Sequence, residues 1–243
     1  MSQMSLTILS LYPRQMNIYG DAGNLLVLRK RCEWRDIAVK VVNFEPGDGP
    51  AAFKDTDLIC SGGGQESSQT AVKEDIVRIA PYLRELIEND TPALAICATY
   101  QLFGAYYKTF EGEIIEGAGI FALHTDSGAE RNIGNIVISS SEFGELIGYE
   151  NHSGLTFLHE GQQPLARVIS GFGNNGKDGT EGVRYRNAIG TYLHGPLLPK
   201  SPQIADHLIA TALEQRYGEP VELVPLPAPW LDHARAIAKT RPQ

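Results

Sequence analysis

The sequence predicts an α/β protein with a mostly parallel central sheet, helices on both faces of that sheet and an antiparallel extension. In the first half of the chain, short apolar runs alternate with helix-like segments, which is typical of a doubly wound parallel sheet. In the second half, short strand candidates are separated by Gly, Asn and Ser turns, which favours antiparallel strands added to the same sheet. The chain has 243 residues and no internal repeat, so a single domain over 1–243 is expected, with its core at about 6–213.

The first half supplies the parallel strands and most of the helices. Strands are expected at 6–11, 38–44, 57–60 and 92–97, where the runs are apolar or β-branched. The segment 20–24 has turn residues and a plausible N-cap before an amphipathic helix at 25–34. Helical periodicity covers 67–89, and Pro81 is expected to divide it into two helices because proline removes a backbone donor.

The second half predicts the antiparallel strands and the C-terminal helices. Ser201 as cap and Pro202 at the first position predict a helix through Arg216. A proline-rich segment begins at 220, and a short helix is expected around 231–239. The strand candidates are 117–123, 135–140, 148–152, 166–171 and 182–192.

Composition excludes several classes of protein. The net charge of −8 and the lack of a basic stripe argue against a nucleic-acid partner. No apolar run approaches the roughly 20 residues that a membrane span needs, and the first residues do not read as a signal peptide. An odd number of cysteines indicates a reduced, cytoplasmic protein without a disulfide framework (Cys32, Cys60, Cys97).

Cys97 is the most informative residue. It ends the apolar run 92–96 and is followed at once by helix-like sequence, the arrangement of a nucleophile elbow. His194 ends another strand-like run far downstream, so the two side chains together suggest a Cys/His pair for acyl transfer. Taken singly, each is more often a packing or structural residue, and the spacing alone leaves catalysis about as probable as packing.

Two glycine-rich segments lead to different expectations. Gly62–Gly64 follows a strand and is either a tight turn or an oxyanion loop beside Cys97. The segment 171–177 matches G-x-G-x-x-G and the start of a P-loop, but Asp178 replaces the required hydroxyl and no helix follows. It is therefore expected to be a hairpin-type surface loop without a nucleotide. No spacing typical of a metal site occurs, and no metal is expected.

Four segments, in order, resemble the cobyric-acid-synthase-like branch of class I glutamine amidotransferases, which have a flavodoxin-like fold. The opening segment 17–24 with Leu28-Arg-Lys-Arg31 narrows the resemblance to the GatD family, the glutaminase subunits of lipid II isoglutaminyl synthase. The likeness runs from about Leu6 to about Leu213. The four segments are Gly62–Gly64, Ile96-Cys97-x-x-Tyr100-Gln101, Tyr149–His152 and Gly190–Pro196.

The resemblance implies a role for each matching residue. Cys97 attacks the side-chain amide of glutamine, and His194 activates the thiol and protonates the departing ammonia, giving a γ-glutamyl thioester that water hydrolyses. Arg131 holds the α-carboxylate of glutamine, a natural use of a guanidinium. The Ala98 N–H and the backbone of Gly63 and Gly64 are implied oxyanion donors, and Gln101 is implied in substrate binding. His152 lies in a family segment without an assigned role.

The sequence departs from the pattern at two positions. Thr99 stands where a small glycine is common, and Pro196 stands where the wider class has the Glu that orients the histidine. The orienting acid is therefore missing, relocated or supplied by another protein. The isolated chain is accordingly expected to be a poor glutaminase that improves when its partner docks.

The resemblance also implies the assembly. The partner is a Mur-ligase-like subunit called MurT, which carries ATP and magnesium and amidates the α-carboxyl of D-glutamate in lipid II; no cofactor is expected in this chain and no direct membrane insertion. The alternatives are a glutaminase subunit for a cobyrinate-type acceptor and a non-catalytic scaffold with the same fold.

Overall fold

The computed structural model describes residues 3–240 and contains two sheets of six strands each. The first sheet has the order β11-β12-β4-β3-β1-β2 and is parallel except for β11, which pairs antiparallel with β12. This confirms the α/β class with a mostly parallel sheet. Its strands are β1 (Ser5–Leu11), β2 (Ala38–Phe44), β3 (Leu58–Ser61), β4 (Ala93–Ile96), β11 (Val183–Tyr185) and β12 (Ala188–Thr191).

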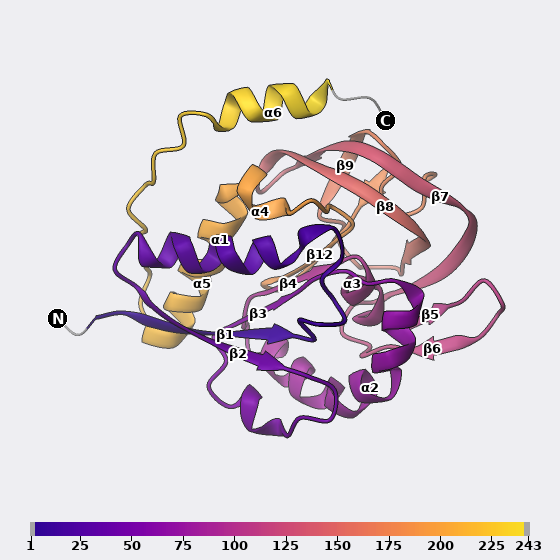
Figure 1. The fold of residues 1–243 in the computed structure, drawn as a ribbon, viewed down its shortest axis with the longest axis horizontal. Helices are drawn as coiled ribbons and strands as arrows, with labels where there is room; N and C mark the ends of the chain where they lie inside the picture. The colour runs from indigo at the N-terminus through magenta and orange to yellow at the C-terminus, as the bar shows by residue number, and fades with distance from the viewer. Residues whose placement is uncertain (1–2, 241–243) are drawn as a thin grey trace.

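Helices cover both faces of the first sheet (Figure 1). Helix α1 (Ala22–Glu33) packs against α5 (Pro202–Tyr217) and against β2. Helix α1 connects β1 to β2, whereas helix α2 (Glu66–Glu88) connects β3 to β4, a step in the opposite direction along the sheet. Because both crossovers are right-handed, α2 lies on the other face of the sheet from α1. The remaining helical segments are η1 (Ile18–Gly20), η2 (Pro50–Phe53), α3 (Ala98–Leu102), α4 (Leu197–Lys200) and α6 (Leu231–Lys239).

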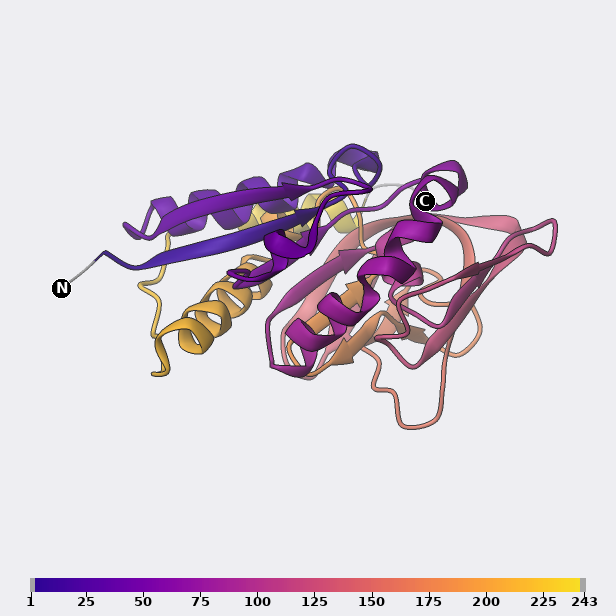
Figure 2. The same cartoon turned by 90° about the horizontal axis from the view of Figure 1, so that it is seen from below.

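The second sheet lies beside the carboxyl ends of the parallel strands (Figures 1 and 2). It has the order β10-β9-β7-β5-β6, with β8 paired to β7. Of the second-half strands only β11 and β12 join the first sheet, and β12 pairs parallel with β4, so the expectation that all these strands form an antiparallel extension of that sheet is wrong. The strands are β5 (Tyr106–Lys108), β6 (Ile114–Glu116), β7 (Leu123–Ser140), β8 (Gly144–Leu158), β9 (Ala166–Ser170) and β10 (Thr180–Glu181).

Two further expectations are wrong in detail. Pro81 lies inside the single helix α2, because the buried residues Ile76, Ile79 and Leu83 keep helical spacing across it and their packing outweighs one lost hydrogen bond. The segment 117–122 is not a strand, since the N–H groups of residues 117–121 donate to carbonyls of residues 102–105 at the end of α3, and the Ala122 N–H donates to Oε1 of Gln162. The loop after β9 does connect an antiparallel pair, β9 and β10, as a hairpin.

The sheet topology gathers four loops at one edge. The loops after β1, β3, β4 and β12 leave the carboxyl ends of adjacent parallel strands, the place where open α/β sheets bind ligands. The chain also reverses its direction of winding between β1 and β3 at this edge. No helix among residues 3–240 is long and apolar enough to cross a membrane.

Candidate active site

Cys97 occupies a strained turn between β4 and α3. Its backbone has φ 48° and ψ −105°, and φ values in this range are uncommon for residues other than glycine. The Cys97 N–H donates to the Thr191 carbonyl of β12 at 2.8 Å, which fixes the turn against the strand that leads to His194. Backbone strain of this kind persists only where the surroundings enforce it, and it concentrates at functional sites.

His194 lies beside Cys97 and is fully buried. Its backbone exchanges hydrogen bonds with Tyr149 of β8, so the end of β12 is held between the two sheets. Burial alone would lower the pKa of His194, but the neighbouring Cys97 sulfur and the Asp21 carboxylate outweigh this and raise it to about 10. The site therefore favours a protonated His194.

Asp21 is the acid that orients the histidine. Its Oδ2 lies 3.0 Å from Nδ1 of His194, and both side chains are buried. The Nε2 of His194 has no hydrogen-bond partner within residues 3–240, so it is available to the thiol of Cys97. Among the three options left open above, the structure supports relocation of the acid, from the position after the histidine to the loop after β1.

Gly63 lies against all three of these residues. A Cβ built on Gly63 would be 2.6 Å from Cε1 of His194, 3.0 Å from Cβ of Cys97 and 3.2 Å from Oδ2 of Asp21. Only a residue without a side chain fits there. The Gly63 N–H donates to Oδ2 of Asp21 at 2.7 Å, so it is occupied and the expectation that it donates to an oxyanion is wrong.

Thr99 connects the elbow to this glycine-rich loop. Its hydroxyl donates to the Gly62 carbonyl at 2.7 Å and lies 2.8 Å from the hydroxyl of Ser61. The departure from a small residue at this position thus adds a connection between β3 and the turn after β4. The implied oxyanion donors that remain are Gly64, which lines the cavity described next, and Ala98, the first residue of α3.

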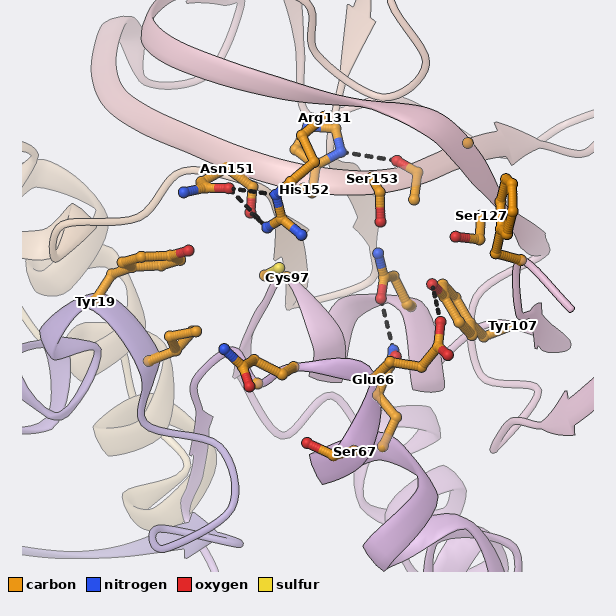
Figure 3. A pocket seen from close by; sticks show the side chains of 18 of the residues that line it. Tyr19, Glu66, Ser67, Cys97, Tyr107, Ser127, Arg131, Asn151, His152 and Ser153 are labelled. Atoms are coloured by element: carbon orange, nitrogen blue, oxygen red, sulfur yellow. Dashed lines mark hydrogen bonds between the residues drawn. The ribbon is translucent and has the colours of Figure 1, made fainter.

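A cavity of about 580 Å³ opens in front of Cys97 (Figure 3). Arg131 lines it from β7, and Asn151 of β8 holds its guanidinium through Oδ1, at 3.0 Å from Nε and 2.7 Å from Nη2. Gln101 lines the cavity from α3; it donates to the Tyr192 hydroxyl at 2.9 Å and accepts from Gln69 at 2.6 Å. The cavity thus brings Cys97, Gly64, Arg131 and Gln101 together.

His152 also lines this cavity, but its contacts are with Tyr192 and Gly154 and not with Asp21. Its ring stacks on Tyr192, with centroids 3.6 Å apart and planes 6° apart, and its Nδ1 lies 2.7 Å from the Gly154 carbonyl. It supports the cavity wall.

Two residues of the site, Asp21 and Tyr19, were not predicted from the sequence. Asp21 looks like a helix N-cap, yet its side chain makes no capping bond. Tyr19, with φ 54°, places its ring edge-on to His194 at a centroid distance of 5.1 Å. The signal that could have found Asp21 is its place after β1, because the carboxyl ends of parallel strands meet at one edge. No group of three or more His, Cys, Asp or Glu side chains in the described part of the chain could hold a metal ion.

Comparisons with known proteins agree with this arrangement. Residues 7–202 match the model of the CobB/CobQ-like glutamine amidotransferase domain. The chain is 41% identical to the lipid II isoglutaminyl synthase (glutamine-hydrolyzing) subunit GatD of Staphylococcus aureus, over 89% of this chain and 88% of that protein. It is 37% identical to the subunit of the same name from Streptococcus pneumoniae, over 90% and 84%. A solved structure titled as a glutamine amidotransferase superposes with a TM-score of 0.59 at 15% identity, covering 84% of this chain and 98% of that one, which supports the fold.

Proposed function

The chain belongs to the CobB/CobQ-like glutamine amidotransferase family, and we propose that it is a glutaminase subunit that releases ammonia from glutamine for a partner ligase. One observation carries this proposal. A cysteine on a strained elbow adjoins a buried histidine, whose other ring nitrogen is held by an aspartate. That order of nucleophile, base and orienting acid is the one that acyl transfer requires.

The chemistry starts with the Cys97 sulfur and His194. The thiolate is the nucleophile, and a nearby protonated histidine stabilises it. Attack on the side-chain amide carbon of glutamine forms the S–C bond, and His194 gives its Nε2 proton to the departing nitrogen, so ammonia leaves and a γ-glutamyl thioester remains. Water, deprotonated by His194, then hydrolyses the thioester to glutamate.

The other residues position the substrate. Negative charge on the amide oxygen during attack is stabilised by the N–H groups of Ala98 and Gly64. Arg131 binds the α-carboxylate, with its guanidinium already oriented by Asn151. Gln101 lines the cavity, and both polar atoms of its side-chain amide are held: the oxygen accepts from Gln69 and the nitrogen donates to the Tyr192 hydroxyl.

The names of two relatives support the proposed acceptor and partner. Two chains of similar length are named as subunits of lipid II isoglutaminyl synthase, which supports a separate partner subunit. We infer a Mur-ligase-like, MurT-type partner, which supplies ATP and magnesium and amidates the α-carboxyl of D-glutamate in lipid II.

Reconstitution tests this function. The chain is coexpressed with a Mur-ligase-like candidate, and the purified complex is supplied with glutamine, ATP, magnesium and lipid II. Glutamate release coupled to amidation of lipid II, detected by mass spectrometry and absent with Cys97→Ser, is the expected result. Glutamine hydrolysis without amidation of lipid II would point to another acceptor, such as a cobyrinate-type carboxylate. A lack of hydrolysis in the complex would favour the scaffold alternative.

A further inference from the structure

The cavity in front of Cys97 contains one carboxylate and one guanidinium among the described residues that line it. The carboxylate belongs to Glu66 and the guanidinium to Arg131. Glu66 is the first residue of helix α2, and Arg131 lies on strand β7 of the second sheet, so the two charges come from different parts of the fold. Figure 3 shows Arg131 beside Asn151 on one side of the cavity and Glu66 on the opposite side.

The position of Glu66 has an ordinary structural explanation. An acidic side chain in the first turn of a helix is favoured by the helix dipole, whether or not it binds anything. A residue with that role alone needs no particular partner and points freely into solvent. Glu66, in contrast, has a specific hydrogen-bond partner, Tyr107.

Tyr107 orients the Glu66 carboxylate. The Tyr107 hydroxyl donates to Oε2 of Glu66 at 3.1 Å, and its ring belongs to β5 and is buried. Tyr107 also lines the cavity, as do Ser127 and Ser153 near its hydroxyl (Figure 3). An exposed carboxylate is thus directed by a fixed donor from the second sheet into the same cavity as the nucleophile.

Free glutamine carries two opposite charges on its α-carbon. If Arg131 binds the α-carboxylate, the α-ammonium lies within a few ångströms of it and needs an acceptor, because a desolvated ammonium without one is strongly unfavourable. We propose that Glu66, oriented by Tyr107, binds the α-ammonium of the substrate. This assignment rests on the proposed glutaminase function and adds a specificity-determining residue to it.

The pair of charges has a consequence for selectivity. Glutamine within a peptide or with an acylated amino group lacks the α-ammonium, so Glu66 would keep the Tyr107 hydroxyl but would lose its oppositely charged partner. The site therefore selects the free amino acid and discriminates against compounds that share only the side-chain amide.

The test compares two substrates and three proteins, each as the complex with the partner subunit. The substrates are L-glutamine and 4-carbamoylbutanoate, which is glutamine without the α-amino group. The proteins are the wild type, Glu66→Gln and, as a matched control, Glu113→Gln, which removes an exposed carboxylate that pairs with Lys73 of α2 outside the cavity. The preference for glutamine is the ratio of kcat/KM for glutamine to kcat/KM for the analogue. If the analogue is not hydrolysed, its inhibition constant against glutamine is measured instead. Thermal unfolding checks that each variant folds.

Wild type and Glu113→Gln are expected to prefer glutamine, whereas Glu66→Gln should lower that preference by at least about tenfold, through KM and not kcat. Equal preference in Glu66→Gln and the wild type would overturn the assignment while leaving the glutaminase function intact. If the wild-type complex hydrolysed no glutamine, the proposed function would fail, and this assignment with it.

Discussion

The carboxylate of Asp21 lies 3.0 Å from Nδ1 of His194, although 173 positions separate the two residues in the sequence. The same carboxylate accepts the N–H of Gly63 at 2.7 Å, so one acid fixes both the histidine and the glycine-rich loop. Pro196, which replaces the usual acid, instead packs against Gly23 just after Asp21, where an added Cβ would lie 2.6 Å from Cγ of Pro196. The triad is therefore assembled within this chain.

Asp21→Asn should lower glutamine kcat by about 10²–10⁴-fold, because the amide cannot stabilise the imidazolium of His194 and favours the wrong tautomer. The fold should persist, since Asn keeps an oxygen for the Gly63 N–H. Steady-state kinetics measure the effect, with the exposed Asp55→Asn as control. Activity within a few-fold of the wild type would mean that another group orients His194.

Gly63→Ala should abolish hydrolysis while leaving most of the chain folded. The new Cβ would lie 2.6 Å from Cε1 of His194 and 3.0 Å from Cβ of Cys97, so the histidine must move away from the thiol. The control is Gly49→Ala, because a Cβ at Gly49 meets nothing within 4 Å. Gly47→Ala is unsuitable as a control, because Gly47 has a positive φ that would strain an alanine. An active Gly63→Ala enzyme would contradict the close packing described here.

Arg131→Gln should raise KM for glutamine about tenfold or more and change kcat less, because it removes a charge-assisted contact with the part of the substrate that does not react. The control is Arg167→Gln, an exposed arginine on β9. A fall in kcat at unchanged KM would assign Arg131 to the reacting end of the substrate instead.

The ionisation of Glu181 should lower the free energy of unfolding as pH rises. Burial raises the pKa of Glu181 to about 8, even though it accepts hydrogen bonds from the Tyr192 N–H and the Thr191 hydroxyl. Because the folded-state pKa is raised, the stabilisation is complete below the unfolded pKa of about 4.3 and is lost as pH rises toward 8. Between these values the free energy of unfolding should fall by up to about 1.4 kcal/mol per pH unit from this group.

Glu181→Gln should flatten that part of the profile. Urea unfolding at intervals from pH 5 to pH 9 measures it, and the slopes of the wild type and the variant are compared. Parallel profiles would show that Glu181 ionises in the folded protein as it does in the unfolded chain.

The sequence predicted the elements that carry a strong local signal. Cys97 and the Gly62–Gly64 loop each follow a short run of apolar residues, and that boundary is visible without a structure. The terminal helix at Leu231–Lys239 and the helix beginning after Ser201 were also correct, because caps, prolines and amphipathic spacing mark them locally.

Features that depend on tertiary packing were missed. Pro81 reads as a break, but buried side chains on both sides of it keep α2 continuous. The long strands β7 and β8 looked like short separate runs, because polar residues and glycines interrupt their apolar pattern near the register shift between Ser127 and Asn132. Asp21 lies in the segment 20–24, which the sequence marks only as a turn with a cap, because its partner His194 follows a strand that β4 and β3 separate from β1.

The pairing of Asp21 with His194 also removes the reason for expecting a poor isolated glutaminase, because the acid that seemed absent at Pro196 is present. Docking of a partner can still change the rate, but the triad does not require it for completion.

Reaction of the isolated chain with a glutamine analogue that carries an electrophilic carbon in place of the amide tests the central claim most directly. Mass spectrometry after proteolysis should find one adduct, on Cys97, that free glutamine prevents. Cys97→Ser and His194→Ala should not react, while Cys32→Ser and Cys60→Ser, which alter buried thiols elsewhere, should react as the wild type does. Labelling of Cys32 or Cys60, or of Cys97 at an equal rate in His194→Ala, would contradict a catalytic Cys97 activated by the histidine.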